Sequence, residues 1–494
     1  MTSPNVSIGC SPWRAALLTL FLSAGLVACA ATPPKSAVQL DVPARFAESR
    51  AWTPLQPQSI APRGAWWQVF NDPLLDQLEN QVAQANQSLQ AALAAYDQAT
   101  ALTNASRAQF YPTLGAGLSA SRFKGGSSGA STANNLSSGP GNTVSADLNA
   151  SWVPDLWGQV RQQVAANAAA VQVSAATVQA TQLSLQASLA QTYLQLRVTD
   201  AQIRLAEQTV AAYQKALQQT ENRYRAGVVS AADVAQARTQ WLGATVTRTD
   251  LAVTRAQQQH AIAVLVGVAP AQLQVPVNDA VPTVVAVPAG VPADVLQRRP
   301  DVAAAAAKVA QANAQLGVAQ TAWLPNVTLS AQAGVRGSRW ADLFNAPNLF
   351  WSLGPALTAT LFNGGARRAQ VASASANYRQ TVANYRQTVL TAFQQTEDNL
   401  AAQRILSEES ALQTQTVQAA ETAQRLAENQ YRAGTAPYLN VVTAQTIANA
   451  ARSAELGLLG RRLTASVLLI EALGGSWGGE ARPALGPPPT ASQE

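Results

Sequence analysis

The chain has 494 residues and a net charge of +6, and charged residues make up only 12% of it, roughly half the share in an average soluble protein. The weak net charge, without clusters of Lys or Arg between aromatic residues, excludes nucleic acid as a partner. No nucleotide-binding glycine motif, nucleophile elbow or Cys/His metal spacing occurs, and the single histidine, His260, has no candidate partner for catalysis. We therefore predict that the protein is not an enzyme and holds no metal and no cofactor beyond a covalent lipid.

The N-terminus has the pattern of a bacterial lipoprotein signal. Arg14 precedes an apolar stretch that ends at Ala28 and is shorter than the roughly 20 residues of a membrane span. The last residues of this stretch, Leu-Val-Ala, followed by Cys29, resemble a lipobox, which predicts a signal peptide over 1–28 and acylation of Cys29. A plain secretory signal with an incidental cysteine is the alternative. Alanine rather than aspartate at position 30 implies, by the same resemblance, release to the outer membrane.

Residues 29–64 are rich in proline and lack periodicity, so we expect an extended, acylated tether. Asp72 and Pro73 then give a helix cap and a first-turn proline. The apolar pattern that follows predicts one helix as far as about Phe110, which Pro112 stops.

Two later segments, 112–156 and 325–362, alternate apolar and small or polar residues with a period of two around a loop. Aromatic residues gather at the strand ends, and the strands are roughly ten residues long, which is typical of transmembrane β-barrels. Ordinary soluble hairpins are the alternative. Because four strands cannot close a membrane-spanning barrel, which needs about eight, this interpretation requires that the chain oligomerise through its strands.

Two very long helices are predicted over 158–226 and 365–433, because apolar residues recur there every seven residues. At 1.5 Å per residue each would be roughly 100 Å long. Each ends at Arg-Ala-Gly and reverses into an antiparallel helix, over 231–266 and 437–472. A coiled-coil stalk is the alternative for such helices, but a stalk does not explain two inserted hairpins.

The chain is a tandem duplication. Residues 221–227 and 428–434 differ at one position only, and the two copies lie roughly 210 residues apart, far beyond the period of a solenoid repeat. The predicted organisation is a first repeat over 65–275, a proline-rich connector over 276–299, a second repeat over 300–475 and a disordered tail over 476–494.

Several motifs carry a family resemblance that covers roughly residues 60–475. They are Trp66-Trp67-x-x-Phe70-x-Asp72-Pro73, Trp152-x-x-Asp155-Leu156-Trp157-Gly158, Arg299-Pro300-Asp301-Val302, Leu361-Phe362-Asn363-Gly364-Gly365 and the two Tyr-Arg-Ala-Gly turns. Together they resemble the outer membrane factor family, the TolC-like and NodT-like channels of efflux and secretion systems.

The resemblance implies a mixed α/β membrane protein in the outer membrane, lipid-anchored, inserted through its barrel and extending into the periplasm. Three chains would form one 12-stranded transmembrane β-barrel, continued by a long periplasmic α-helical barrel. The implied function is the exit duct of a tripartite efflux system, with a periplasmic adaptor and, through the adaptor, an inner-membrane pump as partners. The alternatives are the exit duct of a type I protein secretion system and, from another class, a periplasmic adaptor or coiled-coil structural lipoprotein.

The resemblance also assigns site residues at the helix turns. The adaptor-contact tip would consist of Arg225, Ala226, Gly227, Arg432, Ala433 and Gly434. The periplasmic gate would involve Asn440 and Thr443, where related channels carry acids, together with Tyr438, and Asp233 at the matching place in the first repeat. We expect closure by packing and hydrogen bonds, with Tyr438 narrowing the passage.

Overall fold

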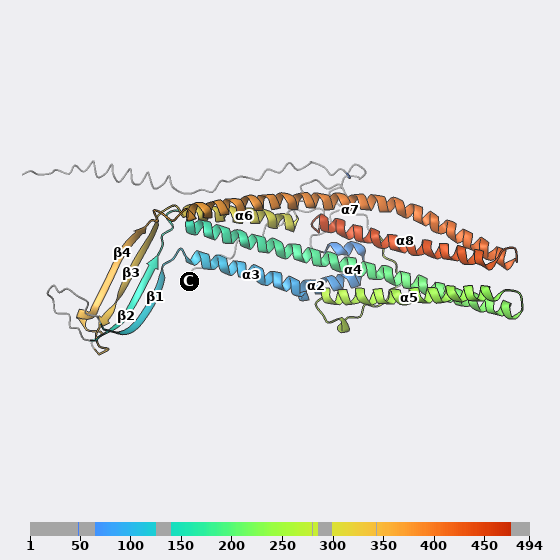
Figure 1. The fold of residues 1–494 in the computed structure, drawn as a ribbon, viewed down its shortest axis with the longest axis horizontal. Helices are drawn as coiled ribbons and strands as arrows, with labels where there is room; N and C mark the ends of the chain where they lie inside the picture. The colour runs from blue at the N-terminus through green and yellow to red at the C-terminus, as the bar shows by residue number, and fades with distance from the viewer. Residues whose placement is uncertain are drawn as a thin grey trace, which may run out of the picture. The chain divides into compact units, whose positions relative to one another are not determined.

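The computed structural model describes residue 48 and residues 65–124, 140–278, 280–284, 299–341 and 343–475. The expected signal peptide, Cys29, most of the tether and the tail lie outside the described residues. The same order of elements occurs twice: a helix or broken helix, a β-hairpin, a long helix and a return helix (Figure 1). In the first repeat these are η2 (Trp66–Phe70), α2 (Pro73–Ala85), α3 (Gln87–Ala108), β1 (Thr113–Phe123), β2 (Gly141–Trp152), α4 (Gln159–Arg225), α5 (Ala231–Leu265) and η3 (Pro270–Gln272). In the second they are α6 (Pro300–Thr321), β3 (Asn326–Gly337), η5 (Ala346–Asn348), β4 (Leu349–Thr358), α7 (Ala366–Arg432) and α8 (Tyr438–Ala472).

The described chain divides into two compact units. The sheet unit contains the four strands and comprises Asp97–Val173 and Ala306–Ala383. The helical unit comprises Ser174–Ala305 and Asn384–Glu494, as far as they are described, with the described residues of Gln39–Tyr96.

One antiparallel sheet, in the order β1-β2-β3-β4, brings the hairpins of both repeats together (Figure 1). The pairing of β2 with β3 joins the repeats, with Trp152 opposite Leu329 at one end and Val144 opposite Gly337 at the other. Strands β1 and β4 each have one neighbour in this sheet. Their outer edges therefore carry backbone groups that can pair with another chain.

The helix predicted to run on to Phe110 is broken at Asn86, which corrects the interpretation of the sequence. Asn86 has an extended backbone, and its Oδ1 accepts from the N–H groups of Ser88 and Leu89 at 2.9 and 3.1 Å, so it caps α3. Its Nδ2 also donates to the Leu265 carbonyl at 2.8 Å. Asparagine is a favoured cap because its side chain replaces missing backbone acceptors, and here it ends one helix and begins the next.

Helices α4 and α7 each contain 67 residues, and α5 and α8 each contain 35. The equal lengths express the duplication in structure. None of the helices in the described part of the chain combines the length and the apolarity needed to cross a membrane.

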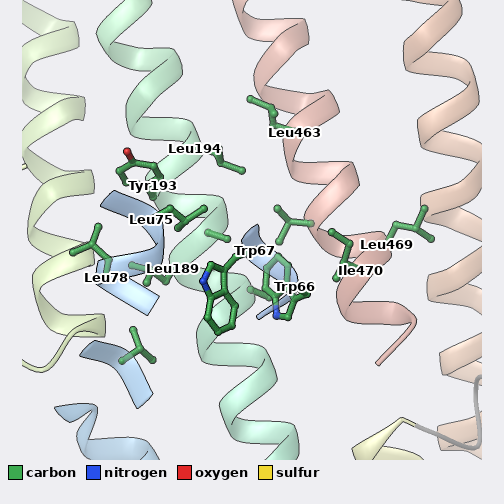
Figure 2. Packing of buried hydrophobic residues seen from close by; sticks show 14 of the residues in the cluster. Trp66, Trp67, Leu75, Leu78, Leu189, Tyr193, Leu194, Leu463, Leu469 and Ile470 are labelled. Carbon is green, nitrogen blue, oxygen red and sulfur yellow. The ribbon is translucent and has the colours of Figure 1, made fainter. Parts of the chain in front are cut away.

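The core of the helical unit is built around η2, which inserts two tryptophans between helices (Figure 2). Trp66 and Trp67 meet edge to face at 6.0 Å and are almost completely buried. Leu75 of α2, Leu189 of α4 and Ile470 of α8 lie in the same cluster. Burying such aromatic side chains contributes several kcal/mol. The paired tryptophans of the sequence motif are therefore packing residues.

Charged motif residues also hold this unit together. Asp72 caps α2 and accepts from the Tyr193 hydroxyl at 2.7 Å. Arg299 forms a bidentate pair with Asp301 and donates to the Ala472 carbonyl at 3.0 Å, which ties the start of α6 to the end of α8. Such buried charged groups are retained when they are paired and hydrogen-bonded.

One acid in this core has no such partner. The Glu79 side chain is fully buried, and within the described residues neither of its carboxyl oxygens has a hydrogen-bond partner. Burial, and to a lesser degree the neighbouring Asp76, raises the pKa of Glu79 to about 9. Glu79 is therefore a neutral acid at physiological pH.

Candidate functional site

The sheet has one polar and one apolar face. Because side chains alternate along a strand, residues paired across the strands share a face. The polar face contains Ser119, Ser145, Asp147, Asn149, Gln332 and Ser352. The Gln332 amide donates to Asp147 at 3.3 Å across β2 and β3. Gly117 and Gly334, opposite Asp147 on either side, leave space for its carboxylate.

The other face is apolar and exposed. Its members include Leu114, Leu118, Leu148, Trp351 and Leu353, and each exposes more than half of its side chain. A contiguous apolar surface of this kind marks contact with a membrane or a partner rather than with water. Aromatic side chains stand at both ends of the strands, with Tyr111 and Trp323 at one end and Phe123 and Trp340 at the other.

The two Arg-Ala-Gly turns have the same backbone geometry. Gly227 and Gly434 have φ of +74° and +75°, and the Val228 and Thr435 N–H groups close the helix ends by donating to Arg223 and Gln430 carbonyls at 2.9 and 3.0 Å. This is a left-handed helix cap that favours glycine. The six residues predicted for the tip are all exposed: Arg225, Ala226, Gly227, Arg432, Ala433 and Gly434.

Side chains hold the arginines of the two turns locally. Arg225 donates to Asn222, and Arg432 lies 3.7 Å from Glu428. The helix ends thus present two similar loops, each with a guanidinium beside a glycine cap.

The helices that follow the two turns begin differently. Ser230 and Asp233 form a capping box: Asp233 Oδ2 accepts from the Ser230 N–H at 2.9 Å, while the Ser230 hydroxyl accepts from the Asp233 N–H at 3.3 Å. In the second repeat the cap is Pro437, which makes no side-chain cap bond. Proline has no N–H to donate, so an acid at the matching position would have no cap to complete. Asn440 occupies that position and is exposed.

The other two residues predicted for the gate, Thr443 and Tyr438, lie in different surroundings. Thr443 is exposed, and its hydroxyl donates to the Leu439 carbonyl of its own helix at 2.9 Å. Tyr438 is only 6% exposed and packs with Leu217, Ala237, Val441 and Val442. Burial is the main reason that its pKa is raised. Tyr438 therefore packs between the helices of the two repeats, and its role in narrowing the passage stays a prediction.

A contact between the two repeats was not apparent from the sequence. The Arg223 guanidinium of α4 lies 4.6 Å from the ring centre of Tyr431 in α7, and that ring lies 5.3 Å from the ring of Tyr438 in α8. Arginine over an aromatic face contributes about 0.5–2 kcal/mol. Farther from the turns, Asn449 of α8 donates to the Tyr213 hydroxyl of α4 at 2.8 Å. These links join the helix pair of one repeat to the pair of the other.

Comparison with known proteins assigns the chain to a family. The profile described as "Outer membrane efflux protein" matches residues 78–268 and 291–475, one segment for each repeat. The chain belongs to this family. It is 33% identical over 465 residues to the antibiotic efflux pump outer membrane protein ArpC of Pseudomonas putida, covering 93% of this chain and 96% of that protein. It is 32% identical over 423 residues to the pyoverdine export outer membrane protein OpmQ of Pseudomonas aeruginosa, covering 83% and 87%.

Solved structures of the family have the same fold. The outer-membrane channel OprN superimposes with a TM-score of 0.83 at 27% identity, over 90% of this chain and 99% of that one. VceC of Vibrio cholerae gives 0.78 at 28% identity, over 84% and 99%. The predicted tandem plan of long helices and β-hairpins is therefore confirmed. This member of the efflux protein family is an outer membrane channel of an efflux pump that extends into the periplasm, not an enzyme or an adaptor.

Proposed function

We propose that three copies of the chain close one β-barrel and one helical duct. The two-faced sheet with two single-neighbour edges carries this proposal. An open edge in lipid leaves backbone groups unpaired at several kcal/mol each, so β4 of one copy must pair with β1 of the next. The apolar face would then contact lipid, and the polar face would line the passage.

Three is the smallest number of copies that would leave an open duct. Two copies would supply eight strands, and an eight-stranded barrel is just wide enough to be filled by its own side chains. Three copies supply twelve strands and leave an interior that the small polar residues of the lumen face, such as Ser119 and Ser145, line without filling. The long helices would continue this duct through the periplasm.

The two glycine-capped turns are the proposed contact for a periplasmic adaptor, through which an inner-membrane pump delivers its cargo. They are exposed, alike in geometry, and repeated, so a trimer would present six similar loops in a ring. Repeated weak contacts of this kind combine into a strong one when the partner is also a ring. Acylation of Cys29 would add a lipid anchor to the barrel.

The proposed cargo is small organic molecules rather than secreted protein. The relatives are described by their names as proteins for efflux of antibiotics and toluene and for export of pyoverdine. The residues of the lumen face, mostly Ser, Thr and Gly, make it polar without a dense charge, which suits the passage of varied small molecules.

For the gate we propose that the contacts between the repeats hold the turns in a closed arrangement. Breaking the Arg223–Tyr431 contact would weaken the hold of the first helix pair on the second near the turns. The Asp233 carboxylate stays hydrogen-bonded to Ser230 in the capping box and takes no part as a cation ligand.

The test is complementation in a cell from which the gene has been deleted. Restoring the gene should lower the accumulation of a fluorescent efflux substrate and raise resistance to the compounds exported. Unchanged accumulation, with the protein present in the outer membrane, would contradict the efflux function. If the deletion abolishes the secretion of a protein and leaves the accumulation of small molecules unchanged, the result would support the secretion alternative.

A further inference from the structure

A basic pocket lies at the loop end of the sheet. Arg122, one residue before the end of β1, faces Asn142 of β2 in the strand register, and Arg339 follows the end of β3. With Ser338 and Trp340 these residues line a pocket of about 420 Å³. None of the described residues that line it is acidic.

Neither arginine has a partner within the described part of the chain, in contrast to three other arginines of the sheet unit. Arg161 is paired with Asp155 at 3.0 Å, Arg336 lies 4.9 Å from the ring centre of Phe350, and Arg367 lies 5.6 Å from that of Trp323. Arg122 and Arg339 have neither an ion pair nor a hydrogen bond among the described residues. Two guanidinium groups at one pocket, with no carboxylate among the described lining residues, repel each other and favour an anion between them.

The register places this pocket relative to the membrane. Arg122 shares its face with Leu118 and Leu114, the apolar face of β1. It lies at the end of that face away from the chain's connections to the helices, because β1 starts directly after α3 and ends in the loop. If the helices extend into the periplasm and the apolar face meets lipid, as the proposed function requires, the pocket lies at the headgroup level of the outer leaflet.

We propose that this pocket binds a phosphate group of a phosphorylated outer-leaflet lipid. Arginine is suited to this role because its planar guanidinium donates two hydrogen bonds to phosphate oxygens. The amide of Asn142 and the hydroxyl of Ser338 supply further donors. Tryptophan side chains such as that of Trp340 are enriched where acyl chains meet headgroups. Pockets that combine basic residues with a membrane interface recognise anionic lipid headgroups by this chemistry.

The probe is lipid A, a phosphorylated glycolipid, presented in mixed micelles to the full-length protein purified in detergent. The binding of fluorescent lipid A would be compared between wild type, the double variant Arg122→Gln/Arg339→Gln and the control Arg336→Gln. Arg336 is an arginine of the same sheet, but the register places it on the opposite, polar face, opposite Ser145. The double variant should bind lipid A at least tenfold more weakly at physiological ionic strength, and the control should match wild type.

The proposal would be overturned by equal binding by the double variant, by equal binding of dephosphorylated lipid A, or by an equal loss in the control. Inorganic phosphate at millimolar concentration should compete poorly, since it lacks the acyl chains. Full competition would show an anion site without lipid recognition and would also overturn the proposal. Conductance of the same samples in planar bilayers separates the two claims: channels that conduct but ignore lipid A refute the pocket alone, whereas samples that form no channel refute the proposed function.

Discussion

Replacing Gly434 by valine should weaken docking of the adaptor without preventing folding. The backbone at Gly434 has a φ of +75°, and a Cβ added there would meet nothing within 4 Å. The cost is therefore conformational alone, about 1–2 kcal/mol for an L-residue in the left-handed region, and at the upper end for a β-branched side chain. In the free variant the turn relaxes out of this geometry, and returning it to that geometry on docking costs the same free energy. The affinity for the adaptor should therefore fall by about 5–30-fold.

Two control variants distinguish backbone strain from the simple addition of a side chain. Gly434→Asn should dock nearly as wild type, because asparagine tolerates the left-handed region. Gly457→Val adds the same side chain to α8, where space is also open and φ is not positive, and should dock normally. The assay is the affinity of detergent-purified protein for the adaptor of its pump, together with substrate export in cells that depend on this channel. Equal docking by the valine and asparagine variants, whether both normal or both impaired, would refute the reasoning.

Three further predictions concern other parts of the chain. Radiolabelled palmitate should enter the wild type and not Cys29→Ser; label that persists in the variant would contradict acylation at this cysteine. Because the folded state holds a proton on Glu79 between pH 4.5 and about 9 that the unfolded chain has lost, stability falls as pH rises through this range. Glu79→Gln should therefore raise the thermal unfolding midpoint relative to wild type at about pH 8 but not at about pH 4. The same difference between variant and wild type at both pH values would show that the pKa of Glu79 is not raised in the fold. Multivalent cations added from the periplasmic side should block single-channel current poorly in the wild type, and Asn440→Asp should create a block that is relieved as pH falls towards about 4; tight block of the wild type from that side would place an acid at the gate.

The fold class was predictable because its signals are long and repeated. A seven-residue apolar step over nearly 70 residues and a period of two in the strands leave few alternatives, and the duplication shows each pattern twice. The break at Asn86 was not predictable from periodicity, since the apolar pattern continues across it and a single side chain replaces the helical acceptors. Similarly, nothing in the sequence near Glu79 distinguishes a fully buried acid from a solvated one.

The candidate site was predictable in part. Glycines after Arg-Ala at both turns identified left-handed caps, because that backbone strongly favours glycine. The burial of Tyr438 could not be inferred, because it depends on Leu217 and Ala237, which belong to the other repeat. The role of Asp233 was available in the sequence, as Ser230 three residues before it forms a capping box, and Pro437 in the second repeat removes the donor that an acid there would need.

The central claim is that the chain forms a duct only as a trimer, and the mass of the detergent-purified complex tests it most directly. The protein part of the complex, separated from bound detergent by light scattering with refractive-index and absorbance detection, should correspond to three chains. A single chain, or two chains that together close eight strands, would contradict the account.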